Sequence, residues 1–333
     1  MERITLFQTL LACLIPVCFC VAIGALAGWL KILDTESVRS ISTYVVIFAL
    51  PCLLFVGIFK FTVQELSQWQ NLVTLLVAMT ATWAIAYVVG RFIWRFSSGE
   101  AAIMALTSSF PNMAYIGVAV LTTLFSTTGL LPVILGNFVS SFVLIPVTVL
   151  FLHMAGGGKR AGSGNDIPAG TTKAAPTSSL ARDILHTVVQ PLVWAPLLGI
   201  ALVLVHFTLP ELASKSIGTI GDTAGGVALF AVGVMLFGFS FRIDPEVATV
   251  FVLKNLVQPA IAAAVLFAFG LRGVMAEGIV IVLACPAATA CPMLASSYRV
   301  GEKSAAASVA VSTVSSLLTL SGWILCAKAA FAG

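Results

Sequence analysis

The chain has 333 residues, of which 59% are hydrophobic and only 9% are charged, and its net charge is +4. Soluble domains contain about 45–50% apolar and about 25% charged residues, so this composition excludes a soluble globular protein and predicts an integral membrane protein. Apolar runs of about 20 residues, long enough to cross a bilayer as helices, recur along the whole chain.

The first apolar run, residues 7–30, is expected to be a membrane-spanning helix rather than a cleaved secretory signal. Residues 25–27 (Ala-Leu-Ala) match the small-x-small pattern of a cleavage site. However, the run has about 24 residues, whereas the core of a signal peptide has about 7–15. In addition, Glu2 offsets Arg3 where a signal peptide has a positive leader.

The apolar runs and their polar breaks predict ten membrane spans in two groups of five. The expected spans are 7–30, 38–59, 72–93, 101–124 and 131–154, followed by 185–206, 217–240, 249–270, 277–298 and 304–327. The stretch between the groups is rich in Gly, Ser, Thr, Pro and charge, which is typical of a flexible linker. The predicted organisation is a first five-helix repeat (1–154), a cytoplasmic linker (155–183) and a second repeat (184–333).

The distribution of lysine and arginine predicts the orientation, because positive residues in loops stay on the cytoplasmic side. In a ten-span layout, 12 basic residues lie in loops on one side, and five, including Lys60, Lys215 and Arg272, lie on the other. We therefore expect a multi-pass protein of the inner (plasma) membrane, with both termini on the periplasmic or extracellular side. Five spans per half then place the second repeat upside down relative to the first, which is typical of secondary transporters.

The fourth and ninth expected spans are interrupted near their centres. Pro111 and Asn112 break the fourth, and Pro286 and Pro292 break the ninth. A proline removes a backbone N–H and frees a carbonyl one turn earlier, and unwound backbone persists at this depth only where it is buried in protein or lines a cavity. Half-helix N-termini that meet there suit an anion without a basic side chain nearby. The other prolines inside spans are interpreted as simple kinks.

Three motifs connect the chain to a known family: FALPCLLF (48–55), SFPNMAYIG (109–117) and LKNLVQPAIAAAVLFAFGL (253–271). They resemble the auxin efflux carrier family, and the chain looks most similar to its bacterial malonate carriers. The resemblance covers nearly the whole chain apart from the linker. It implies an all-α, ten-helix fold of two inverted five-helix repeats, related to that of the bile acid:sodium symporters.

The resemblance also implies how such a fold works. Spans 1, 2, 6 and 7 form a scaffold, and spans 3–5 and 8–10 form a transport core in which the broken helices 4 and 9 cross. Organic anions are moved by an elevator motion of the core against the scaffold. A homodimer through the scaffold helices is also implied.

The predicted substrate site lies around the two breaks. By resemblance, Pro111, Asn112 and Gly117 stand where the family has its proline, its substrate-facing asparagine and its close-packing glycine. The second break has no asparagine, and Thr289 is its one side-chain donor, so we expect an asymmetric site. The full set of predicted substrate-binding residues is Pro111, Asn112, Met113, Tyr115, Gly117, Asn137, Pro286, Ala287, Thr289 and Pro292.

Polar residues elsewhere in the core spans are assigned structural roles. Ser and Thr of span ten, residues 312–319, are expected to bond within their own helix or to pack against neighbours, and contact with substrate or an ion is the alternative. Lys254, about one turn inside its span, is expected to extend to the cytoplasmic surface. The middle of each expected span lacks Asp and Glu, so a proton relay has no obvious carboxylate. The coupling ion, Na+ or H+, is left open.

The sequence as a whole predicts a secondary active transporter of a small organic anion, malonate or a related carboxylate. Its expected partners are the substrate and membrane lipid, with no nucleic acid, no metal site and no cofactor beyond a coupling ion. Motifs of aspartyl, zinc, P-loop or serine chemistry do not occur, so we do not expect an enzyme. The alternatives are a passive anion channel, which would show no counterflow, and a membrane receptor, which would need a signalling partner.

Overall fold

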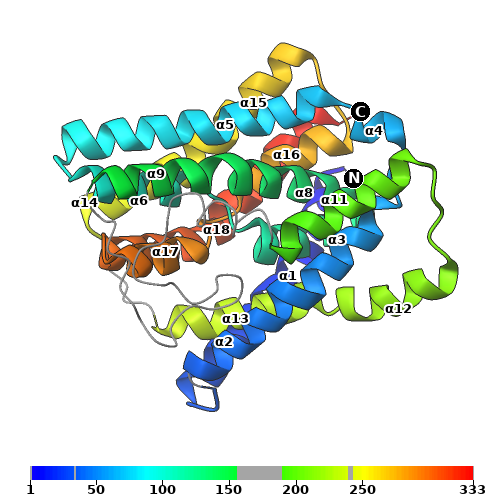
Figure 1. Cartoon of the computed structure of the whole chain (residues 1–333), viewed down its shortest axis with the longest axis horizontal. Coiled ribbons are helices and arrows are strands. Elements are labelled where there is room, and N and C mark those ends of the chain that lie inside the picture. The colour runs from blue at the N-terminus through cyan, green and yellow to red at the C-terminus, as the bar shows by residue number, and fades with distance from the viewer. Residues whose placement is uncertain (1, 34, 156–189, 239–242, 333) are drawn as a thin grey trace.

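The computed structural model describes the backbone of residues 2–33, 35–155, 190–238 and 243–332, and within these ranges all regular elements are helical. The first half (Figure 1) contains α1 (Glu2–Trp29), α2 (Thr35–Tyr44), η1 (Val45–Ala49), α3 (Leu50–Ile58), α4 (Val63–Leu66), α5 (Trp69–Val88), η2 (Val89–Ile93), α6 (Ser98–Ser109), η3 (Met113–Gly117), α7 (Val118–Phe125), η4 (Ser126–Gly129), α8 (Leu130–Val139), η5 (Ser140–Leu144) and α9 (Ile145–Met154). The second half contains α11 (Pro191–Leu204), α12 (Glu211–Gly221), α13 (Ala224–Gly238), α14 (Pro245–Val252), η6 (Leu253–Val257), α15 (Gln258–Phe269), α16 (Val274–Ala284), α17 (Ala290–Tyr298) and α18 (Glu302–Phe331).

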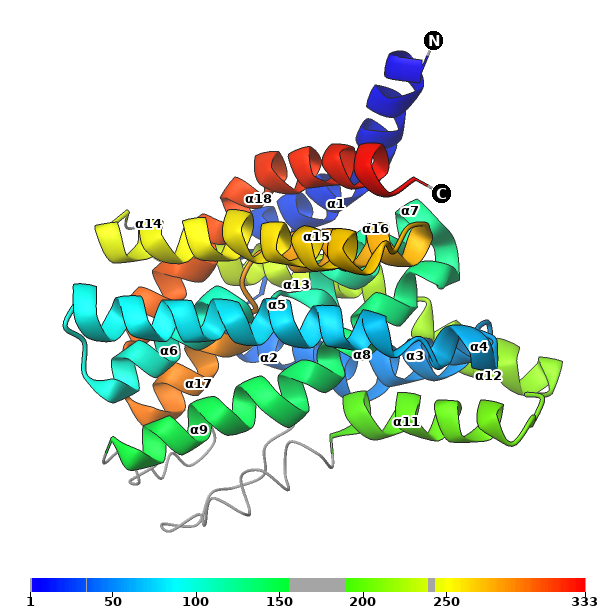
Figure 2. The same cartoon turned by 90° about the horizontal axis from the view of Figure 1, so that it is seen from above.

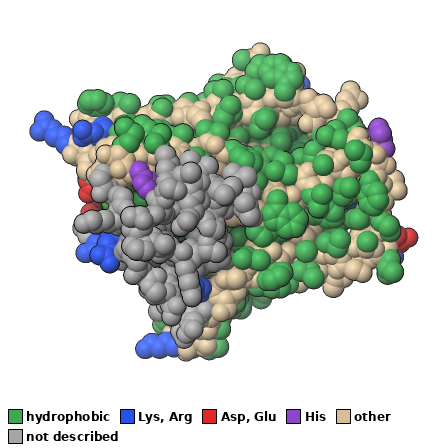
Figure 3. All heavy atoms as spheres, viewed as in Figure 1, with side chains coloured by type: hydrophobic (Ala, Val, Ile, Leu, Met, Phe, Trp, Pro, Cys, Tyr) green, Lys and Arg blue, Asp and Glu red, His purple; other side chains and the backbone are tan. Residues whose placement is uncertain are grey.

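Several helices are long and apolar enough to cross a membrane. Six such runs occur in the described residues: Ser37–Ile58, Val63–Ile93, Met113–Met154, Glu211–Leu236, Pro245–Phe269 and Glu302–Phe331. Ile15–Trp29, Pro191–Leu204 and Val274–Ala284 are shorter apolar helices. Large apolar side chains also cover much of the exterior, as the broad hydrophobic area in Figure 3 shows. Because lipid rather than water suits such a surface, the chain is a multi-pass integral membrane protein.

The helices agree with the expected spans in place but differ in detail. Each expected range contains a described helix. The run Met113–Met154 reverses at Ser126, whose φ is +55°, so that α7 and α8 are separate helices. The seventh span starts earlier than residue 217, because α12 begins at Glu211, with Pro210 at its N-cap. The predicted linker, apart from Ala155, lies outside the described residues.

Local sequence signals set several helix boundaries near the breaks. Ser97 begins α6 with a capping box, in which its hydroxyl accepts from the Glu100 N–H and Glu100 accepts from the Ser97 N–H at 3.0 Å. This exchange pairs two backbone donors that have no partner within the helix. At the end of α15, Gly270 adopts a left-handed conformation with φ +67°, which glycine permits without steric cost. The chain then turns into α16.

The helices form two groups that lie side by side in Figure 1, whereas in Figure 2 part of the first group lies behind the second. One group contains α1, α2, α3, α11, α12 and α13, in which α1 packs along α13 and both α11 and α12 pack on α3. The other contains α5 to α9 and α14 to α18. In the first group, a Cβ atom added to Gly24 would overlap the carbonyl oxygen of Phe230, and one added to Gly233 would overlap that of Val21. Glycine therefore allows α1 and α13 to cross at backbone contact distance.

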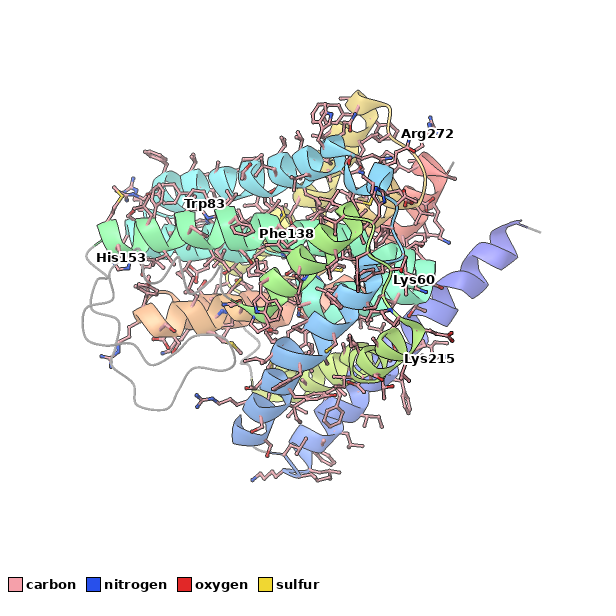
Figure 4. All side chains as sticks on the ribbon, turned by 45° about the vertical axis from the view of Figure 1, so that its right-hand side comes forward. Lys60, Trp83, Phe138, His153, Lys215 and Arg272 are labelled. Atoms are coloured by element: carbon pink, nitrogen blue, oxygen red, sulfur yellow. The ribbon has the colours of Figure 1, made fainter. Side chains whose placement is uncertain are left out.

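Figure 4 shows that labelled residues near the ends of the expected spans lie toward two ends of the molecule. Lys60, Lys215 and Arg272 lie at one end, and His153, at the end of α9, lies at the opposite end. These three basic residues belong to the smaller group of the loop count. The arrangement agrees with alternating loops in a membrane-spanning chain.

Candidate functional site

The two helix breaks meet and pair with each other. Pro111 and Ala287 form an isolated antiparallel bridge. The Asn112 N–H donates to the Pro286 carbonyl at 2.7 Å, and the Ala288 N–H donates to the Phe110 carbonyl at 2.9 Å. These two bonds satisfy backbone groups that the breaks remove from their helices. The spans α6–α7 and α16–α17 therefore cross at their unwound residues, as the sequence predicted.

The breaks also free carbonyl groups at the ends of α6 and α16, and one neighbouring span caps both. In a continuous helix, the Ser109 carbonyl would accept from Met113, whose N–H instead donates to Pro111. The Gln258 side chain donates to this Ser109 carbonyl at 2.6 Å. A buried carbonyl left unpaired costs about 1–3 kcal/mol, so Gln258 stabilises the first break.

Lys254 plays the same part at the second break. Its Nζ donates to the Leu283 carbonyl at 2.8 Å. The usual helical donor to that carbonyl would be the Ala287 N–H, which donates to the Ser312 hydroxyl instead. Because Lys254 and Gln258 are four residues apart, they lie on one face of the η6–α15 helix, and that face contacts both breaks.

Asn255 and Ser312 hold the second break through a side-chain network. The Ser312 hydroxyl accepts from the Ala287 N–H at 3.0 Å and donates to the Asn255 Oδ1 at 2.6 Å. The Asn255 amide donates in turn to the Ser312 carbonyl at 3.1 Å. Asn255 and Ser312 are both fully buried. Their network fixes the unwound segment against α18.

Three buried polar atoms around the first break are left without a partner in the structure. They are the Asn112 Nδ2, the Ser108 Oγ and the Gln258 Oε1. Asn112 is only 2% exposed, so bulk water does not satisfy its amide. Most buried polar side chains have a partner, and such a cluster of unpaired donors and acceptors at a helix break is suited to a polar ligand.

Comparison with known proteins identifies the family. A family described as "Membrane transport protein" matches residues 9–324. The chain belongs to this family. It includes the auxin efflux carriers, so the resemblance found in the sequence motifs is confirmed.

Two relatives show how members of this membrane transport family are described. The chain is 27% identical to "Uncharacterized transporter YfdV" of Escherichia coli (strain K12), over 93% of this chain and 95% of that protein. It is 23% identical to "Putative malonate transporter" of Rhizobium meliloti (strain 1021), over 86% of each chain. The family and these relatives are described as transporters and not as enzymes, so the chain is a membrane transporter.

The structure places some of the predicted site residues of this transporter at the crossing. Pro111, Asn112, Pro286 and Ala287 form the paired segment itself. Thr289 is 4% exposed and directly precedes α17 without bonding to its N-terminus. These residues form the candidate site that the crossing of the two breaks defines.

Other predicted residues pack against neighbouring helices. The Met113 sulfur lies close against Gly136 of α8. A Cβ added at Gly117 would approach a Val282 methyl group to 3.2 Å, which agrees with the close packing expected there. Pro292 is half-buried within α17, and Tyr115 is buried beside Ser42 of α2.

Asn137, also predicted to bind substrate, lies in α8. Its amide donates to the Val133 carbonyl of its own helix at 3.0 Å. Among the described residues, its hydrogen bond is made within its own helix and not with Asn112. The structure therefore does not bring the two amides together by hydrogen bonding.

The expectation that Lys254 extends to the cytoplasmic surface is wrong. The side chain is 0% exposed and lies inside the core, on the Leu283 carbonyl. The freed carbonyl at the second break offers a buried partner, which a position one turn inside a span does not reveal. The signal in the sequence was the polar set Lys254, Asn255 and Gln258 in an otherwise apolar span.

Proposed function

We propose that this membrane transporter is a secondary active transporter that binds a small organic anion, malonate or a related carboxylate, where the two broken spans cross. The observation that carries the proposal is the pairing of the breaks beside the unpartnered Asn112 amide. This amide is a donor, as a carboxylate requires. The relative named as a malonate transporter supports the choice of substrate class.

Helix ends add to the attraction for an anion. η3 with α7 starts at Met113 and α17 starts at Ala290, so two helix N-termini begin directly after the paired segment. The first N–H groups of a helix have no partner within it, and the helix dipole favours negative charge there. Half-helix N-termini bind substrate carboxylates in other transporters with broken helices.

The architecture that we propose is the ten-helix arrangement of two inverted five-helix repeats. The opposite directions of the paired breaks support it, since an antiparallel bridge joins them. α1, α2–α3, α11 and α12–α13 would form the scaffold, and α5–α9 with α14–α18 the transport core, in agreement with the two groups of helices. The core would move against the scaffold as an elevator, and two scaffolds would join in a homodimer.

The proposed location is the inner membrane, with both termini outside. The start of α1 and the end of α18 lie at the same end of the molecule as Lys60, Lys215 and Arg272 (Figures 1 and 4). The loop count supports an outside position for this end, because most basic residues belong to the other side. A cysteine-labelling assay from either side of the membrane would test the orientation.

The decisive experiment is counterflow of labelled malonate in liposomes that contain the purified protein. A transporter exchanges internal unlabelled malonate for labelled external malonate, and the rate saturates. Asn112→Ala should abolish exchange while the protein stays folded, because the variant loses the unpartnered amide. Malate and other dicarboxylates, added as competitors, would define the range of substrates.

Asn71→Ala is the matched control for the loss of a buried asparagine. Asn71 is 2% exposed, and its amide donates to Gln68 at the start of α5, away from the crossing. This variant should retain exchange. Flux without saturation or counterflow would indicate a channel, and wild-type exchange in Asn112→Ala would remove Asn112 from the site.

A further inference from the structure

Lys254 is a buried basic residue in the apolar centre of the protein. Its side chain is 0% exposed, and its Nζ bonds to the Leu283 carbonyl, three residues before Pro286. The Pro286 carbonyl accepts the Asn112 N–H, so the lysine lies next to the proposed anion site. It is located in η6, a π-helical turn, and such turns inside α-helices are frequent at functional sites.

The surroundings of Lys254 provide no negative charge among the described residues. The buried thiols of Cys285 and Cys291 lie close to it. The helices that contact η6 are α5, α6, α14, α15, α16 and α18. Their acidic, basic and phenolic groups, with the adjoining η2, are Tyr87, Arg91, Glu100, Glu246, Glu277, Glu302, Lys303 and Lys328, and none forms an ion pair with Lys254 in the described part of the chain.

An ammonium group in this position would be costly without a counter-ion. Isolated buried charges cost several kcal/mol even after the protein relaxes, and intramembrane basic residues pair or mark functional pathways. An uncharged amine avoids that cost and still donates to the Leu283 carbonyl. The carboxylate of a substrate at the crossing would supply the missing negative charge.

A cavity of about 80 Å³ lies among the starts of α6, α14 and α18, and Lys254 itself is not one of its lining residues. Val250, one helical turn before Lys254, lines it, together with Glu100, Glu246, Thr107 and Ser308. The Ser308 hydroxyl is buried and has no partner in the structure. The volume is sufficient for several water molecules. Two carboxylates in the lining favour protons over anions, so the cavity suits proton entry.

We propose that Lys254 carries the coupled proton, binding one proton together with each substrate anion. A proton from water adds to the lone pair of the Lys254 amine and forms an N–H bond, and the bound carboxylate balances the new charge. Release of the anion on the other side returns the proton to water. This inference rests on the proposed function, and it names the coupling ion for that site.

Coupling of this kind would lower the electrical cost of anion import. An anion that enters a negative-inside cell pays about 2.3 kcal/mol per charge per 100 mV. Protonation of Lys254 would offset one negative charge of the cargo. A monoanion bound together with this proton has no net charge. After release, the uncharged Lys254 returns with the empty site, so the membrane potential would not oppose either step of the cycle.

Titration calorimetry of malonate binding to the purified, full-length protein tests the proposal. Binding is measured between pH 7 and pH 9 in two buffers that differ in ionisation enthalpy, which gives the number of protons bound per anion. We expect close to one proton per anion, and therefore an affinity that falls about tenfold per unit rise in pH, the change expected for one linked proton. Malonate binding without proton uptake would overturn the role of Lys254.

Lys254→Met locates the proton, and Lys215→Met is its matched control. Methionine keeps much of the length of the side chain but cannot take up a proton, so uptake should disappear. Lys215 is an exposed lysine that pairs with Glu211 on α12, and its variant should bind malonate and a proton as the wild type does. Persistent uptake in folded Lys254→Met would place the proton elsewhere, for example on the second carboxylate of malonate. If the wild type binds no carboxylate at all, the proposed function itself fails.

Discussion

Replacing Ser312 with alanine should destabilise the crossing, because its hydroxyl serves both the second break and Asn255. The hydroxyl accepts from the Ala287 N–H at 3.0 Å and donates to the Asn255 Oδ1 at 2.6 Å. Ser312→Ala leaves both of these buried groups without that partner. The Asn255 amide keeps its bond to the Ser312 backbone carbonyl, so Asn255 should stay in place.

The magnitude follows from the two groups left unpaired. Each costs about 1–3 kcal/mol when buried, which gives a range of about 2–6 kcal/mol. Side-chain hydrogen bonds between membrane helices are weaker, about 0.6 kcal/mol on average and about 1.7 kcal/mol at most. Two bonds of at most about 1.7 kcal/mol each limit the total to about 3 kcal/mol. The lower end of the range for two unpaired groups is about 2 kcal/mol. We therefore expect a loss of about 2–3 kcal/mol in the free energy of unfolding.

Reversible unfolding in mixed detergent, followed by circular dichroism, would measure this loss. Ser315→Ala is the control on the same helix, because the half-buried Ser315 hydroxyl bonds only to the Val311 carbonyl of α18. Substitutions of this kind change stability by about 0.5 kcal/mol or less. Equal stability of the Ser312→Ala and Ser315→Ala proteins would refute the structural role of the network.

Two further substitutions test the packing of the groups and the cap of the first break. Gly24→Ala should separate α1 from α13 and lower the thermal midpoint, because the new Cβ would overlap the Phe230 carbonyl, whereas Gly218→Ala, with no atom within 4 Å of its Cβ, should not. Equal midpoints for the two variants would contradict the contact. Gln258→Met should cost about 1–3 kcal/mol of unfolding free energy, since the Ser109 carbonyl loses its donor; an unchanged value in the same detergent assay would show that another group caps it.

The sequence predicted the breaks because proline has a fixed chemical consequence. Pro111 and Pro286 each lack the N–H that a helix requires, so the interruption of the fourth and ninth spans could be located to within a few residues. The match in depth of the two interruptions predicted that they meet, and the bridge between Pro111 and Ala287 confirms the meeting. Long apolar runs likewise located the helices that carry them.

The partners of the freed backbone groups could not be predicted in the same way. Ser312 looks like other Ser and Thr residues of span ten, and Thr313 indeed bonds back to the Val309 carbonyl of its own helix. Ser312 instead bonds to Asn255, which is 57 residues away. Only the three-dimensional crossing of the spans distinguishes these two hydroxyls. Lys254 was misplaced for the same reason, because its partner is a carbonyl that the second break creates.

At the crossing, the freed backbone groups that have hydrogen-bond partners serve the fold, and the polar side chain without a partner is available for binding. Side chains of η6, α15 and α18 pair the freed groups at Ser109, Leu283 and Ala287, so the unwound segments are held without a ligand. The Asn112 Nδ2 is different, because it is buried and has no partner among the described residues. A protein that pairs its helix breaks so fully has little structural reason to leave this donor unpaired. Its position beside two helix N-termini is the reason that we propose it as a contact of the substrate.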